Sequence, residues 1–152
     1  IFKNEGFRTT TTNMLGMPEE TDEDIRATIK LNRDLGVDLA ETNYFYPFRG
    51  TELGDLCYEK KYVEDHPGQL VNFRFQYFMK MPQIEPGVLD GLMRTFQLYM
   101  RLPEWLDPVI KLAEKRDKIG NAVFSELQAI VQKMINKKLE LKNKNELSNI
   151  RD

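Results

Sequence analysis

The segment from Thr9 to Thr21, TTTTNMLGMPEET, constrains the fold more than any other part of the chain. Its first seven residues favour an extended strand because threonine is a strong strand former. Gly16 and the proline two residues later predict a tight turn, and the final threonine stands three residues before Asp24, the spacing of a capping box. The segment therefore predicts a strand, a glycine turn and a helix N-terminus. Ligands of parallel sheets commonly bind at such strand ends.

The next segments continue the alternation of strand and helix. Residues 22–35 carry apolar side chains at helical spacing, and Gly36 follows where a C-cap glycine belongs. Residues 37–46, VDLAETNYFY, are rich in strand formers. Two strands joined by one helix predict a parallel βαβ unit. Because the β-favouring residues run continuously in Phe7–Leu15 and Val37–Tyr46, we expect both strands to be buried on both faces. A short helix follows, with Thr51 as its N-cap and its end near Lys61.

The composition changes after residue 72. Aromatic and methionine side chains gather in residues 73–81, and apolar residues then recur at helical spacing up to Leu141. Pro86 suits the first turn of a helix, Pro103 predicts its end, and Gly120 predicts a break. We therefore expect two parts, a βα part at 1–72 and a helical C-terminal extension at 73–152. The aromatic cluster between them is expected to form the seam.

Composition and charge exclude several classes of function. The net charge of −2 gives no basic field for nucleic acid, and no apolar run is long enough to span a membrane. The one cysteine, Cys57, cannot form an internal disulfide, which favours a cytoplasmic location. Cys57 and the single histidine do not form a metal-ligand pattern, so we expect no metal site in this chain. Because residue 1 is Ile, we expect a processed or excised fragment.

Two segments resemble motifs of the radical S-adenosylmethionine (SAM) enzymes. Gly16–Thr21, GMPEET followed by acidic residues, resembles the G-x-P-G-E-T-x-E-D turn of that family. Tyr44–Leu53, YFYPFRGTEL, resembles its P-x-P-G-T-x-L strand end. The two segments stand one βα unit apart, in the family's order, and the match covers roughly residues 6–63. The sequence departs from the pattern at Glu19, where the family has a second glycine.

The resemblance implies an α/β fold, a partial (β/α) TIM-type barrel with few parallel strands, followed by the α-helical extension. It also implies SAM and a [4Fe-4S] cluster as cofactors of the full-length protein, which would use a 5′-deoxyadenosyl radical to abstract a substrate hydrogen. One cysteine cannot supply the cluster's three thiolate ligands, so these would lie outside this chain, and the fragment alone would be inactive. The segment of residues 72–115, from NFRFQYFMKMPQI through LPEWLDPVIKLAEK, resembles the tail of the cobalamin-binding subfamily. This makes cobalamin a further cofactor to consider, and a cobalamin-facing surface the alternative role of the aromatic cluster.

By the same resemblance, the first strand end would contact SAM. Leu15 would pack on the adenine, Gly16 would allow close approach, and Asn13 and Glu20 would be polar contacts. The second strand end, with Tyr44, Tyr46 and Pro47, would contribute backbone hydrogen bonds to the adenine edge. The alternative is that these residues have structural roles only. A glycine turn can join a strand to a helix without any ligand, and tyrosines commonly pack in a core.

Three further polar residues are candidates for the substrate wall. Glu41 and Asn43 stand two positions apart on one strand, so they share a face of the sheet. In a barrel they would point into the interior together, whereas on an isolated sheet Glu41 would lie at an unpaired edge. Arg49 can bind a substrate carboxylate or phosphate, or be a solvated turn residue. The sequence assigns no catalytic residue.

The rival functional class is a non-catalytic α/β interaction module whose helical tail binds a partner. The absence of a cluster motif in this chain is its main support. A nucleotide-binding domain has less support, because neither a phosphate-loop lysine nor a G-x-G-x-x-G motif is present. Since two strands leave a sheet edge unpaired, we also expect the isolated chain to form a homodimer through that edge.

Overall fold

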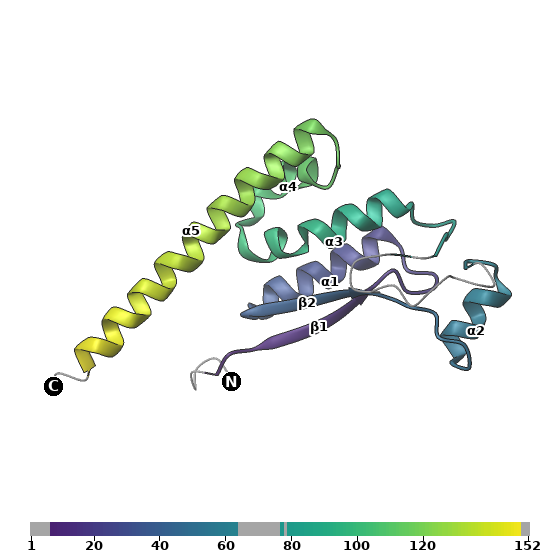
Figure 1. Ribbon diagram of the computed structural model, residues 1–152, viewed down its shortest axis with the longest axis horizontal. Helices are drawn as coiled ribbons and strands as arrows, with labels where there is room; N and C mark the ends of the chain where they lie inside the picture. Colours follow the sequence, from purple (N-terminus) through teal and green to yellow (C-terminus); the bar gives the residue numbers. More distant parts are fainter. Residues whose placement is uncertain (1–6, 64–76, 78, 150–152) are drawn as a thin grey trace.

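The computed structural model describes residues 7–63, 77 and 79–149, with side chains as far as Leu141. The elements, in chain order, are β1 (Thr10–Leu15), α1 (Asp22–Leu35), β2 (Leu39–Tyr44), α2 (Glu52–Glu59), α3 (Pro86–Arg101), the 3-10 helix η2 (Glu104–Leu106), α4 (Asp107–Ala113) and α5 (Lys118–Asn149). The fold class is α/β, as expected, with helices predominating (Figure 1).

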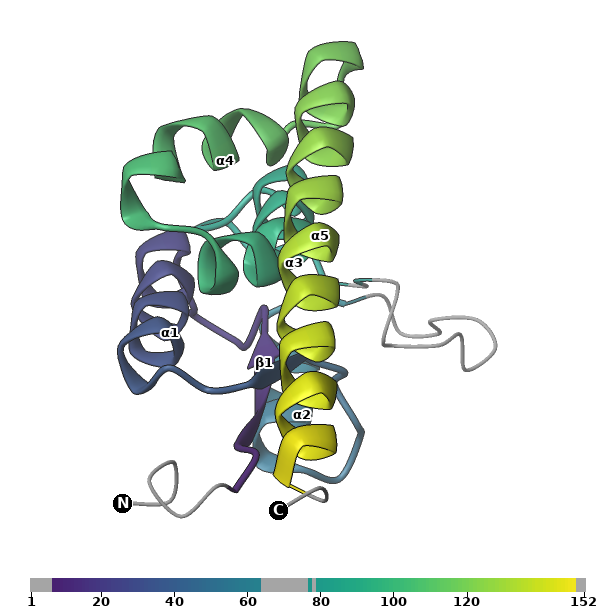
Figure 2. The ribbon, with the colours of Figure 1, turned by 90° about the vertical axis from the view of Figure 1, so that its left-hand side faces the viewer.

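β1 and β2 form a two-stranded parallel sheet, paired from Thr10 opposite Leu39 to Leu15 opposite Tyr44. α1 and α3 lie on one face of this sheet, and among the described residues no element covers the other (Figures 1 and 2). The expectation that the strands are buried on both faces is therefore wrong. Exposed and covered residues alternate along β1 because only one of its faces has helices to pack against.

α1 has the boundaries that the capping signals predict. The Thr21 hydroxyl accepts a hydrogen bond from the Asp24 backbone N–H, and the Asp24 carboxylate accepts one from the Thr21 backbone N–H. Gly36 ends the helix with φ 57°, the left-handed conformation in which glycine is favoured. A polar network joins α1 to the sheet, since the buried amide of Asn32 accepts from Thr11 and donates to Asn13. The capping box and the C-cap glycine are confirmed.

The helical extension packs on the βα unit through one hydrophobic core. Leu15 and Ile25 from the first part belong to the same buried cluster as Leu89, Leu92 and Phe96 of α3. α3 begins with Pro86 at its first turn and ends before Pro103, as expected. The predicted boundary at 72/73 lies outside the described residues, as does most of the aromatic segment. Of that segment, Met79 and Met81 are buried in the core and Tyr77 packs against it.

Two arginines of α1 fix it to the extension. The Arg26 guanidinium donates to both carboxylate oxygens of Glu114, at 2.9 and 3.0 Å. Arg33 donates to both oxygens of Asp107, at 3.0 and 2.7 Å, and through Nε to the Tyr99 carbonyl at 2.6 Å. The Tyr99 hydroxyl in turn donates to Glu114 at 2.5 Å. Because Arg26 and Arg33 are two helical turns apart, they lie on the same face of α1 and hold α3 and α4 along its length.

α5 is the longest element and crosses the molecule as a rod whose C-terminal half extends away from α3 and α4 (Figure 1). It begins at Lys118 and continues through Gly120, so the break expected at Gly120 is wrong. This glycine is buried close to the carbonyls of Leu112 and Lys115, where a side chain would clash. Among the described helices, none combines the length and apolar character that a membrane crossing requires.

We predict that Arg33→Lys destabilises the fold by about 1–2 kcal/mol, because an ammonium cannot reproduce the bidentate pair with Asp107 and the bond to Tyr99. Urea denaturation followed by circular dichroism measures the free energy of unfolding. The matched control on α1 is Lys30→Met, which removes the exposed pair with Asp34 and should leave the midpoint unchanged. Equal stability of Arg33→Lys and the wild type would contradict this account of α1.

Candidate functional site

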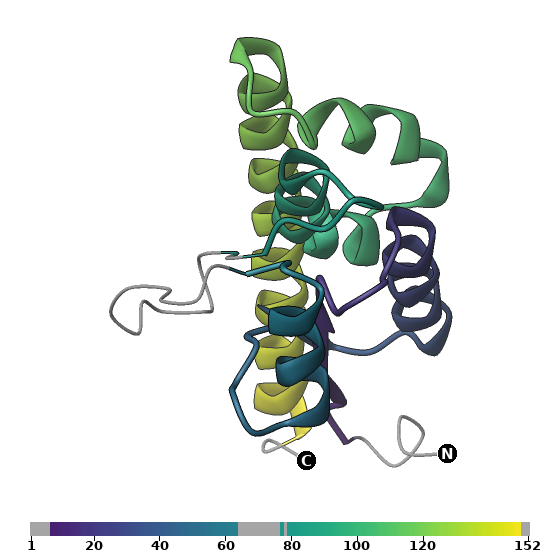
Figure 3. The same cartoon turned by 90° about the vertical axis from the view of Figure 1, so that its right-hand side faces the viewer.

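A cavity of about 490 Å³ lies at the carboxyl ends of the two strands. α2 stands on this side of the molecule, away from α4 (Figures 1 and 3). The lining residues come from both strand ends, from the loop after β2 and from the start of α2: Met14, Met17, Asn43, Tyr44, Phe45, Tyr46, Phe48, Thr51, Glu52 and Leu53. The cavity has the size of a small-molecule site.

The lining is mainly apolar, with few polar groups. Two thioethers come from the β1 side, and the rings of Tyr46 and Phe48 lie tilted with centroids 4.7 Å apart. The polar groups are the Asn43 amide, the Thr51 hydroxyl and the Glu52 carboxylate. Thioethers and rings favour contact with a flat aromatic group, and the polar groups can orient it.

The loop after β2 is held close to α2. The Thr51 hydroxyl caps α2 by accepting from the Gly54 N–H at 3.1 Å, and it donates to the Phe48 carbonyl at 2.7 Å. Gly54 lies so close to that carbonyl that any side chain would clash with it. The cavity wall formed by this loop is therefore a fixed part of the structure.

The glycine turn after β1 is braced by a carboxylate from within the chain. Glu20 Oε2 accepts from the backbone N–H groups of Gly16 at 2.5 Å and Met17 at 3.1 Å. Partial burial raises the pKa of Glu20, although both hydrogen bonds act in the opposite direction. Gly16 has φ 77°, and a side chain there would collide with Tyr77 and Leu89. The groups that approach the Gly16 backbone closely are thus side chains of this same chain, Tyr77 and Leu89.

Glu19 has an uncommon backbone conformation. Its φ is 66°, in the left-handed region that favours glycine. Its carboxylate accepts from Lys60 Nζ at 2.6 Å and from the Tyr62 hydroxyl at 2.7 Å, and these two bonds lower the pKa of Glu19. The side chain therefore links the turn to the end of α2, while the backbone has the geometry that a glycine would adopt most easily.

The structure brings together three of the residues that the sequence singled out. Asn43, Tyr44 and Tyr46 all line the cavity. The Tyr44 hydroxyl also donates to Asp90 at 2.6 Å, and burial followed by this bond raises the pKa of Tyr44. Pro47 follows directly and is fully buried. Of the residues named at the second strand end, Tyr44 and Tyr46 therefore line the cavity and Pro47 lies in the interior.

The first strand end contributes differently. Asn13 faces α1, where its amide oxygen accepts from Asn32 at 2.8 Å. Leu15 is fully buried in the core, on the face that the helices cover. The side chain that reaches the cavity from β1 is Met14, one residue earlier and on the opposite face of the strand.

The two remaining candidates lie outside the cavity lining. Glu41 is exposed on the helix-free face, on the same side of β2 as Asn43 and opposite Thr12 of β1. The Arg49 guanidinium lies 3.7 Å above the centre of the Tyr58 ring, a cation–π contact with α2. In this arrangement Glu41 is open to a ligand on the bare sheet face, and Arg49 supports α2.

Sequence reasoning missed Met14, Met17 and Phe48. Side chains alternate along a strand, so Glu41 and Asn43 share one face of β2. Because Met14 pairs with Asn43 in the parallel sheet, the same reasoning would have placed Met14 on that helix-free face. The register between the strands was needed for that step, and only the structure supplies it. Phe48 has no sequence signal beyond its place in the second motif.

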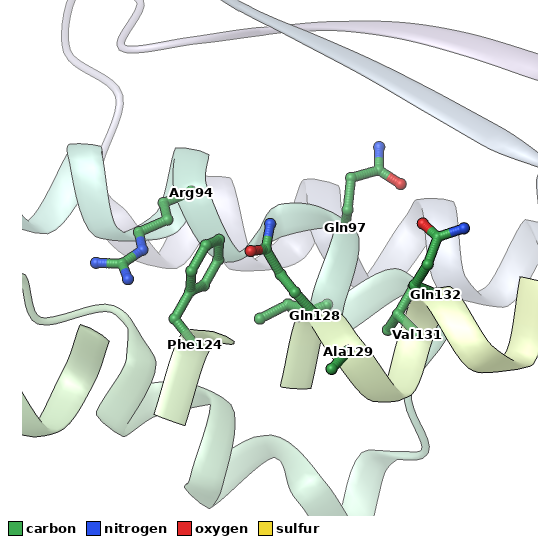
Figure 4. A pocket seen from close by; sticks show the side chains of 8 residues that line it. Arg94, Gln97, Phe124, Gln128, Ala129, Val131 and Gln132 are labelled. Atoms are coloured by element: carbon green, nitrogen blue, oxygen red, sulfur yellow. The ribbon is translucent and has the colours of Figure 1, made fainter. Parts of the chain in front are cut away.

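A second cavity, of about 410 Å³, lies between α3 and α5 (Figure 4). Its wall carries the amides of Gln97, Gln128 and Gln132, and Arg94 lies over the Phe124 ring at 3.9 Å. Gln97 is engaged with the Ala40 carbonyl on the outer side of β2. This cavity lies between two helices of the extension, and its lining contains none of the residues of the two motifs. Within the described residues, no group of three or more His, Cys, Asp or Glu side chains is arranged to hold a metal ion.

Comparisons of the chain with protein-family models, with curated proteins and with solved structures find no match. The function must therefore be argued from the residues and their geometry.

We predict that Glu19→Gly is more stable than Glu19→Ala, with a Tm about 2–4 °C higher. Both variants lose the bonds to Lys60 and Tyr62, but only glycine is unstrained at φ 66°. Thermal unfolding of the two variants isolates the backbone contribution. Equal Tm values would show that the left-handed conformation at residue 19 is not required.

We predict a pH-dependent effect of Glu20→Gln. The pKa of Glu20 is raised in the folded chain, so ionisation costs native stability as the pH rises from about 4.3 through the folded value. Glutamine keeps an acceptor for the Gly16 and Met17 N–H groups and carries no charge. The variant should have the higher Tm at pH 7, and the difference should vanish below about pH 4. A difference that does not change with pH would contradict the prediction.

Proposed function

We propose that this chain is the C-terminal part of a radical SAM enzyme, in which it supplies part of the SAM pocket and part of the substrate wall. One observation carries the proposal. The two segments that resemble the family's motifs, far apart in the sequence, line a single cavity at the carboxyl ends of parallel strands. Met17 comes from the first segment, and Phe48 and Thr51 come from the second.

The turn geometry gives independent support. The family has a glycine where this chain has Glu19, and the backbone of Glu19 has the left-handed conformation that glycine favours. A turn of the same shape would therefore persist despite the substitution, held by the bonds of the Glu19 carboxylate to Lys60 and Tyr62.

The residues of the cavity are suited to hold SAM. Met14, Met17 and the rings of Tyr46 and Phe48 offer an apolar surface for a purine, and Asn43 offers an amide for a polar edge. The helix-free face beside it, with Glu41, would form the substrate wall of a partial (β/α) barrel whose other strands lie outside this chain. Bound SAM, with an electron from an iron–sulfur cluster held elsewhere, would supply 5′-deoxyadenosyl radical chemistry. The protein's part is to orient SAM and substrate and to exclude water.

The test uses the full-length protein, purified anaerobically with its cluster and assayed for 5′-deoxyadenosine formed from SAM. We expect Phe48→Ala to raise the KM for SAM about tenfold, since it removes one side of the apolar wall. The control is Phe124→Ala, a ring in the second cavity that is more buried than Phe48, which should leave this KM unchanged. Absence of 5′-deoxyadenosine from a protein with an intact cluster would refute the proposal, and a KM unaffected by Phe48→Ala would refute this assignment of the pocket.

A further inference from the structure

The C-terminal half of α5 is only partly covered by the described residues: Lys138 Nζ lies 3.9 Å from Asp38 Oδ1, and Met134 and Ile135 line a cavity with Met100 of α3. Every residue from Asn136 to Leu141 is exposed, and the helix continues to Asn149. Leu127, two turns before Met134, is by contrast buried against the body at 4% exposure. A helix that loses its packing partway along is marginal in water on its own, because helical stability in proteins comes mostly from a packed apolar face. We therefore expect a binding partner to stabilise this half of α5.

An apolar stripe continues along this half of the helix. Ile130, Met134 and Leu141 are 44%, 49% and 53% exposed, although all three are large apolar side chains. Their spacings of four and seven residues place them on one face, in the heptad pattern of paired helices. Met134 and Leu141 repeat the heptad position of Leu127. Ile130 lies on the side of Met134 opposite to Val131 and Ile135, which face the body, so a second helix can pack along this exposed flank.

The charges beside the stripe select the partner and its direction. Lys133 and Glu140 directly precede Met134 and Leu141, so they lie on the same flank, two turns apart. If a second α5 runs antiparallel with Ile130 opposite Leu141, then Lys133 faces Glu140 of the other copy. Two-fold symmetry makes this contact twice. In a parallel pair Lys133 would face Lys138 of the other copy, which like charges disfavour.

Within the part of the chain whose side chains are described, Lys133 and Glu140 form no ion pair. In the same antiparallel register Met134 lies opposite Lys137, whose alkyl stem can cover it while its ammonium remains in water. We propose that α5 is a self-association surface, on which a second copy of this chain binds antiparallel along Ile130, Met134 and Leu141. This inference does not depend on the proposed enzymatic function.

The test is sedimentation of this chain across a range of concentrations, with charge variants of α5. The wild type should form a dimer, and Lys133→Glu or Glu140→Lys should each raise its dissociation constant about tenfold by placing like charges together. The double exchange Lys133→Glu with Glu140→Lys restores opposite charges and should restore the wild-type constant. The control is Asn136→Glu, which lies about 200° around the helix from Met134 and should have no effect. Circular dichroism checks that each variant keeps its helices.

Three results would overturn the proposal. The first is a wild type that stays monomeric at all concentrations. The second is a pair of single variants that weaken the dimer without recovery in the double exchange. The third is a dimer that none of the charge changes affects, which would instead support pairing through the sheet edge. At that edge the carbonyls of Asp38, just before β2, and of Ala40 on β2 already accept from Arg101 and Gln97, so β1 has the more open edge.

Discussion

The arrangement of this molecule depends on the position of α1 between the sheet and the helical extension. One side of α1 packs on β1 and joins it through the buried amide of Asn32, and its two arginines bind α3 and α4. Tyr99 connects the two arginine sites, since its carbonyl accepts from Arg33 and its hydroxyl donates to Glu114, the partner of Arg26. An arginine fork holds such partners with a fixed geometry, which a lysine cannot do.

This position of α1 determines which surfaces remain for function. Both α1 and α3 cover one face of the sheet, so the described chain leaves the opposite face bare. That face and the strand ends carry Met14, Glu41 and Asn43, together with the cavity against α2. The extension serves as a support for one face of the sheet, and the proposed ligand contacts fall to the other face. The free half of α5 lies beyond both and provides a surface of its own.

The sequence predicted the ends of α1 and the start of α3 well, because each has a local signal. The capping box at Thr21, the C-cap at Gly36 and Pro86 at the start of α3 depend only on neighbouring residues, and all three are confirmed. The burial of the strands was predicted wrongly, since it depends on how many layers surround the sheet and not on strand propensity. For the site, Tyr44 and Tyr46 could be named from the motif and Asn43 from the alternation of side chains along its strand, whereas the choice of Met14 over Leu15 needed the strand register. The left-handed backbone of Glu19 could not be expected from a glutamate.

The central claim, that the cavity belongs to a radical SAM enzyme, requires cluster ligands that this chain does not contain. The most direct test is to sequence the coding DNA upstream of the Ile1 codon. The account predicts an open reading frame that continues upstream and encodes a C-x-x-x-C-x-x-C motif about 100 to 200 codons before Ile1, on the scale of one domain. A start codon close to Ile1, with no such motif in frame, would contradict the claim and favour a non-catalytic module.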